Sequence, residues 1–257
     1  SRRTERAHFV HFLQNHDQVA NSARGRRLHE LTTPGRFRAL TALLLLGPET
    51  PMLFMGEEFA AGKPFLYFAD HEVDVAKLVR QGRWEFLRAF PRAADFGPKR
   101  LPDPVSRQTF EACKLDWDDC QRHADTLLLH RELLELRRSD PVFSQQDEVW
   151  LEGVVLGPEA FALRWLADDE DDRLLLVNLG SATTIRPMAE TPLAAPVGTT
   201  WKLAWSSEAP RYGGSGTALL NVKDWTIPGH AALVLRPELA ADGKTEPADA
   251  AETQVPA

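Results

Sequence analysis

The sequence predicts a chain in two parts, an α/β part with parallel strands followed by an antiparallel β-sandwich. In the first part, two apolar runs at residues 8–13 and 51–55 flank a Leu-rich helical stretch. This strand–helix–strand alternation is the unit from which both barrels and doubly wound sheets are built. Beyond Pro141, short runs rich in Val, Leu and Trp recur with turn residues between them, which is typical of an antiparallel sandwich.

Local signals place the elements of the first part. A threonine N-cap at Thr33, Pro34 at the first helical position and Gly47 as the C-terminal stop predict a helix over residues 34–46. Both flanking runs are expected to be buried strands. Further helices are predicted near residues 75–90 and over residues 121–138, the latter ending in a basic turn that complements its dipole.

The second part is expected to hold six strands, at residues 149–156, 160–166, 173–179, 201–205, 218–222 and 231–235. We expect three segments: 1–140, the α/β part; 141–237, the sandwich; and 238–257, a disordered tail whose Ala, Glu, Asp and Pro show no apolar period.

Composition and net charge limit the classes of ligand that this chain is expected to bind. The 257 residues are 43% apolar and 26% charged, as in a globular protein, and the net charge of −7 argues against nucleic acid or a membrane surface as partner. A neutral ligand such as a sugar fits this charge. The spacing of Cys113 and Cys120 suits neither a zinc site nor a disulfide scaffold, so we expect no metal, no cofactor and a cytoplasmic location. A start at Ser1 rather than Met indicates a piece of a longer protein.

The most informative segment is the first apolar run, which ends on Asn15, His16, Asp17 and Gln18. In barrel enzymes the catalytic residues follow the carboxyl ends of strands, and such a group of donors and acceptors can bind several sugar hydroxyls. Asp17 is therefore the first catalytic candidate. The competing interpretations are a turn or N-cap role for Asp17 and a structural role for His16.

Residues 12–18, Phe-Leu-Gln-Asn-His-Asp-Gln, resemble the fourth conserved region of the alpha-amylase family of glycoside hydrolases. Three more motifs, at residues 51–59, 64–71 and 82–86, follow in the order found in trehalose-releasing members of that family. Branching enzymes share the Met-Gly-x-Glu-Phe element of the first of these but not the Tyr-Phe-x-Asp-His element of the second. The resemblance extends from Phe9 to about Arg236.

The resemblance implies that the first part is the C-terminal portion of a (β/α)8 TIM barrel, with about strands seven and eight. Asp17 would be the transition-state-stabilising aspartate of a retaining enzyme, while the nucleophilic aspartate and general-acid glutamate, on strands four and five, would precede Ser1. The rest of the barrel would come from the same or a companion chain. The implied substrate is a malto-oligosaccharide capped by trehalose, cleaved at the alpha-1,4 bond next to the trehalose unit. The alternatives are a branching enzyme or amylase of the same family and a non-catalytic glucan-binding module.

The remaining candidates follow from the same resemblance or from local context. The expected substrate-binding residues are Asn15, His16, Gln18, Val19, Ala20, Asn21, Phe68, Asp70 and His71. Val19 and Ala20 would contribute mainly backbone; a packing role is the alternative for Phe68, and an Asx turn is the alternative for Asp70 and His71.

Other conspicuous side chains are assigned structural roles. Glu57 and Glu58 follow strand eight in the family pattern, so we expect a structural role rather than acid catalysis. Trp84 is expected to pack. Arg24, Arg26 and Arg27 are expected to form a solvated or ion-paired face, because no Gly-rich phosphate loop accompanies them.

Overall fold

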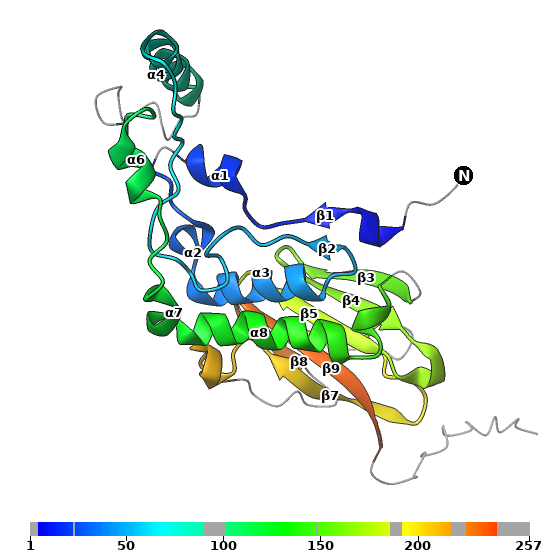
Figure 1. Cartoon of the computed structure of the whole chain (residues 1–257). Coiled ribbons are helices and arrows are strands. Elements are labelled where there is room, and N and C mark those ends of the chain that lie inside the picture. Colours follow the sequence, from blue (N-terminus) through cyan, green and yellow to red (C-terminus); the bar gives the residue numbers. More distant parts are fainter. Residues whose placement is uncertain are drawn as a thin grey trace, which may run out of the picture.

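A computed structural model describes residues 5–22, 24–89, 101–146, 149–185, 192–216 and 225–240. Figure 1 shows a helical part whose long helices lie over an antiparallel sheet, with one helix, α4, standing away from this body. The helices are α1 His16–Ala20, α2 Leu28–Leu31, α3 Pro34–Leu46, α4 Val73–Leu87, α6 Arg107–Ala112, α7 Asp119–Arg122 and α8 Ala124–Ser139, with 3-10 turns η1 Arg6–His8, η3 Phe143–Gln145, η4 Asp168–Glu170 and η5 Pro210–Tyr212. The strands are β1 Val10–His11, β2 Thr50–Pro51, β3 Trp150–Gly157, β4 Ala160–Leu166, β5 Arg173–Asn178, β6 Thr183–Ile185, β7 Thr199–Ser206, β8 Trp225–Ile227 and β9 Ala231–Leu239.

None of the described helices combines the length and apolar character that a membrane span requires.

Helix α3 forms as its local signals predict. The hydroxyl of Thr33 accepts a hydrogen bond from Arg36 N at 3.3 Å, Pro34 opens the helix, and the chain leaves it at Gly47. Leucines on most sides of the helix are buried, in accordance with the absence of a polar face in its sequence.

The two apolar runs form a parallel pair, as predicted, but much shorter strands than expected. Val10 pairs with Thr50 and His11 with Pro51, with α3 in the crossover between them. The expectation that both are buried strands is wrong: Phe9 and Val10 are 51% and 53% exposed, and the second run is half-buried over residues 51–54 with Met55 exposed. Within the described residues β1 and β2 pair only with each other, and a two-stranded ribbon leaves its outer faces uncovered.

The helix predicted over residues 121–138 is divided at His123 into α7 and α8. The ring Nδ1 of His123 lies 3.0 Å from the carbonyl oxygen of Phe59. At the other end, α8 closes on the basic last turn that the sequence predicted, with Arg137 and Arg138. Arg137 in addition donates to the carbonyls of Leu45 and Gly47 at the end of α3 and of Glu49 beyond it. Arg137 thus supplies partners for carbonyls that the last turn of α3 leaves free.

The second part is a five-stranded antiparallel sheet in the order β3-β4-β5-β9-β7. All of β5 is buried, because Leu175 and Val177 face leucines of α3 and α8, whereas Leu174 and Leu176 face the two-stranded β6–β8 ribbon. The described residues of the predicted sandwich therefore contain one large sheet, with helices on one face and this ribbon on the other. The strand predicted at 218–222 lies outside the described residues, and β9 continues past its predicted end to Leu239.

Candidate functional site

The polar cluster that ends the first apolar run forms the short helix α1. The side-chain oxygen of Asn15 accepts from Asp17 N at 2.8 Å, and Gln18 Oε1 accepts from Asn15 N at 3.1 Å. This reciprocal pair is a capping box. The N-cap role that the sequence left open for Asp17 therefore belongs to Asn15, and Asn15 and Gln18 both help to form the helix.

Asp17 itself is exposed, and among the described residues the basic side chain within 4 Å of its carboxylate is that of the adjacent His16. Its side chain is 71% exposed, and its Oδ1 lies 3.5 Å from Nε2 of His16, which is exposed as well. Val19 and Ala20, in contrast, are buried and anchor the helix. In α1, the polar side chains of His16 and Asp17 thus face the solvent, whereas the apolar side chains of Val19 and Ala20 are buried.

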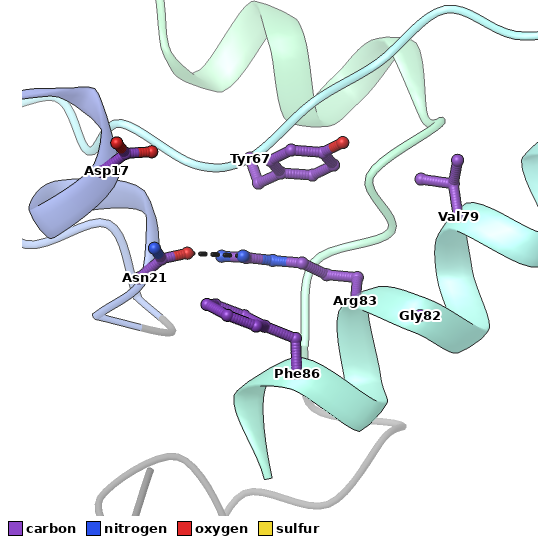
Figure 2. A pocket seen from close by; sticks show the side chains of 7 residues that line it. All are labelled: Asp17, Asn21, Tyr67, Val79, Gly82, Arg83 and Phe86. Atoms are coloured by element: carbon purple, nitrogen blue, oxygen red, sulfur yellow. Dashed lines mark hydrogen bonds between the residues drawn. The ribbon is translucent and has the colours of Figure 1, made fainter. Parts of the chain in front are cut away.

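A hollow of about 410 Å³ opens beside Asp17. Figure 2 shows the side chains around it, which come from α1, from the loop before α4 and from α4 itself. Its lining residues are Asp17, Asn21, Tyr67, Val79, Gly82, Arg83 and Phe86. The hollow therefore combines a carboxylate, an amide, a guanidinium and two aromatic rings, which is a set that can bind a polyhydroxylated ligand by hydrogen bonds and ring stacking.

Arg83 is the central side chain of the hollow. It donates to Asn21 Oδ1 at 2.5 Å and to the carbonyl of Ala20 at 2.7 Å. Its guanidinium lies between two rings, 4.9 Å from the centre of Tyr67 and 5.7 Å from that of Phe86. Burial lowers the pKa of Arg83, and the nearby Tyr67 acts in the opposite direction.

Eight of the nine predicted substrate-binding residues, all except Asn21, do not line this hollow, and three of these eight lie in the segment before α4. Phe68 belongs to an aromatic chain, with ring centres 5.8 Å from Phe65 and 5.1 Å from Phe110. Asp70 and His71 are exposed just before α4 begins. Of the predicted set, only Asp17 and Asn21 line the hollow.

Beneath α1, the structure corrects one expectation. Arg24 and Arg26 are exposed, but Arg27 is 0% exposed, so a solvated or ion-paired face is the wrong description for it. Its guanidinium donates to the carbonyls of Lys63 and Met55 at 2.8 and 2.6 Å. Burial lowers the pKa of Arg27, whereas the neighbouring glutamates, with Glu30 first, oppose this. The chain thus places a buried cation where the sequence suggested a surface.

Glu57 lies in the same buried layer and not in the hollow. One carboxylate oxygen accepts from Phe54 N at 3.2 Å, and burial raises the pKa of this carboxyl to about 6. Glu58 borders a separate hollow of about 470 Å³ between the segment after β2 and α8. Among the described residues, no cluster of three or more His, Cys, Asp or Glu side chains is arranged to hold a metal ion.

The sequence motifs contained the missed residues but did not reveal their role. Tyr67 and the pair Arg83 and Phe86 stand in two of the recognised motifs, yet no site role was assigned to them. All three side chains lie close to α1, and this proximity depends on long-range contacts such as that between Arg83 and Asn21, which are 62 positions apart in the chain. A helical spacing of three between Arg83 and Phe86 was the only local signal that they share a face.

The chain is similar in sequence to curated proteins of known activity. The chain is 37% identical over 198 residues to malto-oligosyltrehalose trehalohydrolase of Deinococcus radiodurans, covering 75% of this chain and 32% of that protein. It is 36% identical over 184 residues to the enzyme of the same name from Rhizobium sp., covering 70% of this chain and 28% of that protein. The chain therefore spans about a third of the length of the curated relatives it matches.

Solved structures and a domain family extend the comparison. A Salmonella typhimurium protein, provisionally described as an alpha amylase, superposes with a TM-score of 0.67 at 32% identity, covering 90% of this chain and 36% of that one. A Bacillus licheniformis trehalose-6-phosphate hydrolase superposes with a TM-score of 0.54 at 15% identity, which shows the shared fold alone, over 89% of this chain and 43% of that one. Residues 150–234 match a domain family described as a domain of unknown function, DUF3459. This match covers the antiparallel sheet from the start of β3 into β9.

Proposed function

We propose that this chain, which is homologous to malto-oligosyltrehalose trehalohydrolases over about a third of their length, forms one wall of the active site of a retaining trehalose-releasing glycosidase. The proposed reaction is hydrolysis of the alpha-1,4 bond next to the trehalose end of malto-oligosyltrehalose. The observation that carries the proposal is the exposed carboxylate of Asp17 beside a hollow rich in polar and aromatic groups. The parallel β1–β2 pair with a crossover helix supports the assignment of these strands to the end of a barrel.

In this proposal Asp17 stabilises the transition state. As the glucosyl ring flattens toward an oxocarbenium ion, hydrogen bonds from its hydroxyl groups to a fixed carboxylate strengthen, so the barrier falls without a covalent bond to Asp17. The exposed carboxylate is free to accept such bonds, because its capping neighbours bond through other atoms. His16 would bind a hydroxyl of the same sugar. The nucleophile and the general acid would come from the part of the barrel that lies outside this chain.

Product analysis of the intact enzyme tests the proposal. Maltotriosyltrehalose and maltopentaose have the same number of glucosyl units but different ends. We expect free trehalose and maltotriose from the first and much slower cleavage of the second. Equal cleavage of both sugars would point to an amylase, and new alpha-1,6 bonds would point to a branching enzyme; either outcome would overturn the proposal.

A glucan-binding module is the alternative of a different class. It predicts that the present chain binds malto-oligosaccharides by itself and that the intact protein releases no trehalose. Titration calorimetry of this chain with maltopentaose, together with the product analysis, separates the two. Tight binding by the chain without any turnover by the intact protein would favour the module.

A further inference from the structure

We infer that Arg83 on α4 is a positioning residue for Asp17: it holds the C-terminal end of α1 and thereby fixes the helix that carries the carboxylate. The inference rests on the proposed function for its consequence in catalysis. Its structural part, that Arg83 restrains α1, stands on the contacts alone. Figure 2 shows Arg83 reaching from α4 to Asn21, with Asp17 on the same short helix.

Helix α1 has little stability of its own. It has five residues, and isolated helices this short are not stable in water. Its N-terminal end is held by the capping box between Asn15 and Gln18. Its C-terminal end needs partners of its own, because the last carbonyls of a helix have no donor within the helix.

Arg83 supplies such a partner. One guanidinium nitrogen donates to the carbonyl of Ala20, the last residue of α1, and the other donates to the side chain of Asn21, the C-cap. A cation at this end of a helix also meets the negative end of the helix dipole. The backbone N–H of Asn21 in turn donates to the carbonyl of Asp17 at 2.9 Å. Two consecutive hydrogen bonds therefore connect Arg83 to the backbone of Asp17.

The guanidinium is itself held in place. Tyr67 and Phe86 lie against it from two sides, so rotation of the side chain away from α1 would lose both ring contacts. Tyr67 comes from the loop before α4 and Phe86 from α4 itself. A lysine would donate from a single nitrogen here and would lack the planar fork that fits between two rings. The site thus requires arginine rather than a positive charge alone.

Hydrogen exchange of this chain tests the structural part. In Arg83→Met the stem remains but both donors are lost, and we expect the α1 amides, above all that of Asn21, to exchange roughly 10- to 100-fold faster. Arg80→Met is the matched control, since Arg80 lies one turn earlier on α4 and pairs with Asp103. Exchange in that variant should stay within about twofold of wild type. Unchanged exchange in Arg83→Met would overturn the inference.

Kinetics of the intact enzyme tests the consequence for Asp17. We expect Arg83→Met to lower kcat for trehalose release roughly 10- to 100-fold while KM changes less than about threefold, because a misplaced carboxylate acts mainly in the transition state. Arg83→Lys should fall between wild type and Arg83→Met, and Arg80→Met should match wild type. Normal turnover by Arg83→Met, or a change in its KM alone, would contradict the positioning role.

The two proposals fail in different ways. An intact wild-type enzyme that releases no trehalose would overturn the proposed function, while the exchange comparison would still decide whether Arg83 restrains α1. An active wild type with equally active Arg83 variants would overturn the inference and leave the proposed function intact. Thermal unfolding of each variant checks that the fold is kept, and Arg83→Lys, which keeps the charge, provides the test if Arg83→Met does not fold.

Discussion

The region around α3, α8 and β5 and the region around α1 and α4 hold their side chains by different means. In the first, leucines with almost no exposed surface form one core with the sheet, and Arg137 bonds to three carbonyls at the end of α3. In the second, a short helix is held by a capping box and by Arg83, while Leu78 and Phe86 of α4 are 68% and 48% exposed. The comparison indicates that the stability of the chain comes from the first region, whereas the candidate site depends on a few polar and ring contacts.

The largest effect is expected in the core. Leu133 is 0% exposed within the cluster that joins α8 to the sheet, so Leu133→Ala should lower the free energy of unfolding by about 3 kcal/mol. Leu78→Ala on α4 is the matched control and should change it by less than about 0.5 kcal/mol. Urea unfolding of both variants measures the difference. Equal losses of unfolding free energy in the two variants would show that burial does not make the α8 region more important for stability than α4.

Arg137 and Arg83 are expected to affect different kinds of stability, global for the first and local for the second. Arg137→Met leaves buried carbonyls of Leu45 and Gly47 without their donor and should cost about 2 to 3 kcal/mol in global stability. Arg83→Met should speed local exchange in α1 with little change in the midpoint of global unfolding. Thermal unfolding and hydrogen exchange, measured on both variants, give the two readouts. A global loss in Arg83→Met as large as that in Arg137→Met would remove the distinction.

A smaller effect is expected from Glu57, which is fully buried and lies outside the lining of the hollow. Burial raises its pKa from 4.5 to about 6, so the folded protein binds this proton more tightly than the unfolded chain does. The associated stability is fully present below about pH 4.5 and is lost as the pH rises through about 6, a change of about 2 kcal/mol. Glu57→Gln should lack this component. The difference in unfolding free energy between wild type and variant, measured from pH 4 to pH 7.5, should therefore vary with pH; a constant difference would contradict the burial of the carboxyl.

The sequence predicted those parts of the fold that depend on local signals. The cap at Thr33, the proline after it and the glycine at 47 predicted α3 correctly, and five of the predicted strands of the second part correspond to β3, β4, β5, β7 and β9. These elements depend on capping and apolar alternation, which are properties of neighbouring residues.

What escaped prediction depends on contacts between distant residues. Arg27 was expected at the surface, but carbonyls of Met55 and Lys63 and the ring of Phe54 surround it. In the same way, Asp17 could be selected from its place after a strand, whereas the role of Arg83 became visible only when α4 was placed against α1. Binding sites built from several segments are predicted only in part when each segment is considered separately.

The role proposed for Asp17 is tested most directly by the turnover of Asp17→Asn in the intact enzyme with maltotriosyltrehalose as substrate. Because asparagine keeps the shape but not the charge, we expect kcat for trehalose release to fall roughly 10³-fold or more with unchanged thermal stability. Asp74→Asn, which changes an exposed carboxylate on α4 that pairs with Lys77, should retain wild-type turnover. Near-normal trehalose release by Asp17→Asn would contradict the proposed stabilisation of the transition state by this carboxylate.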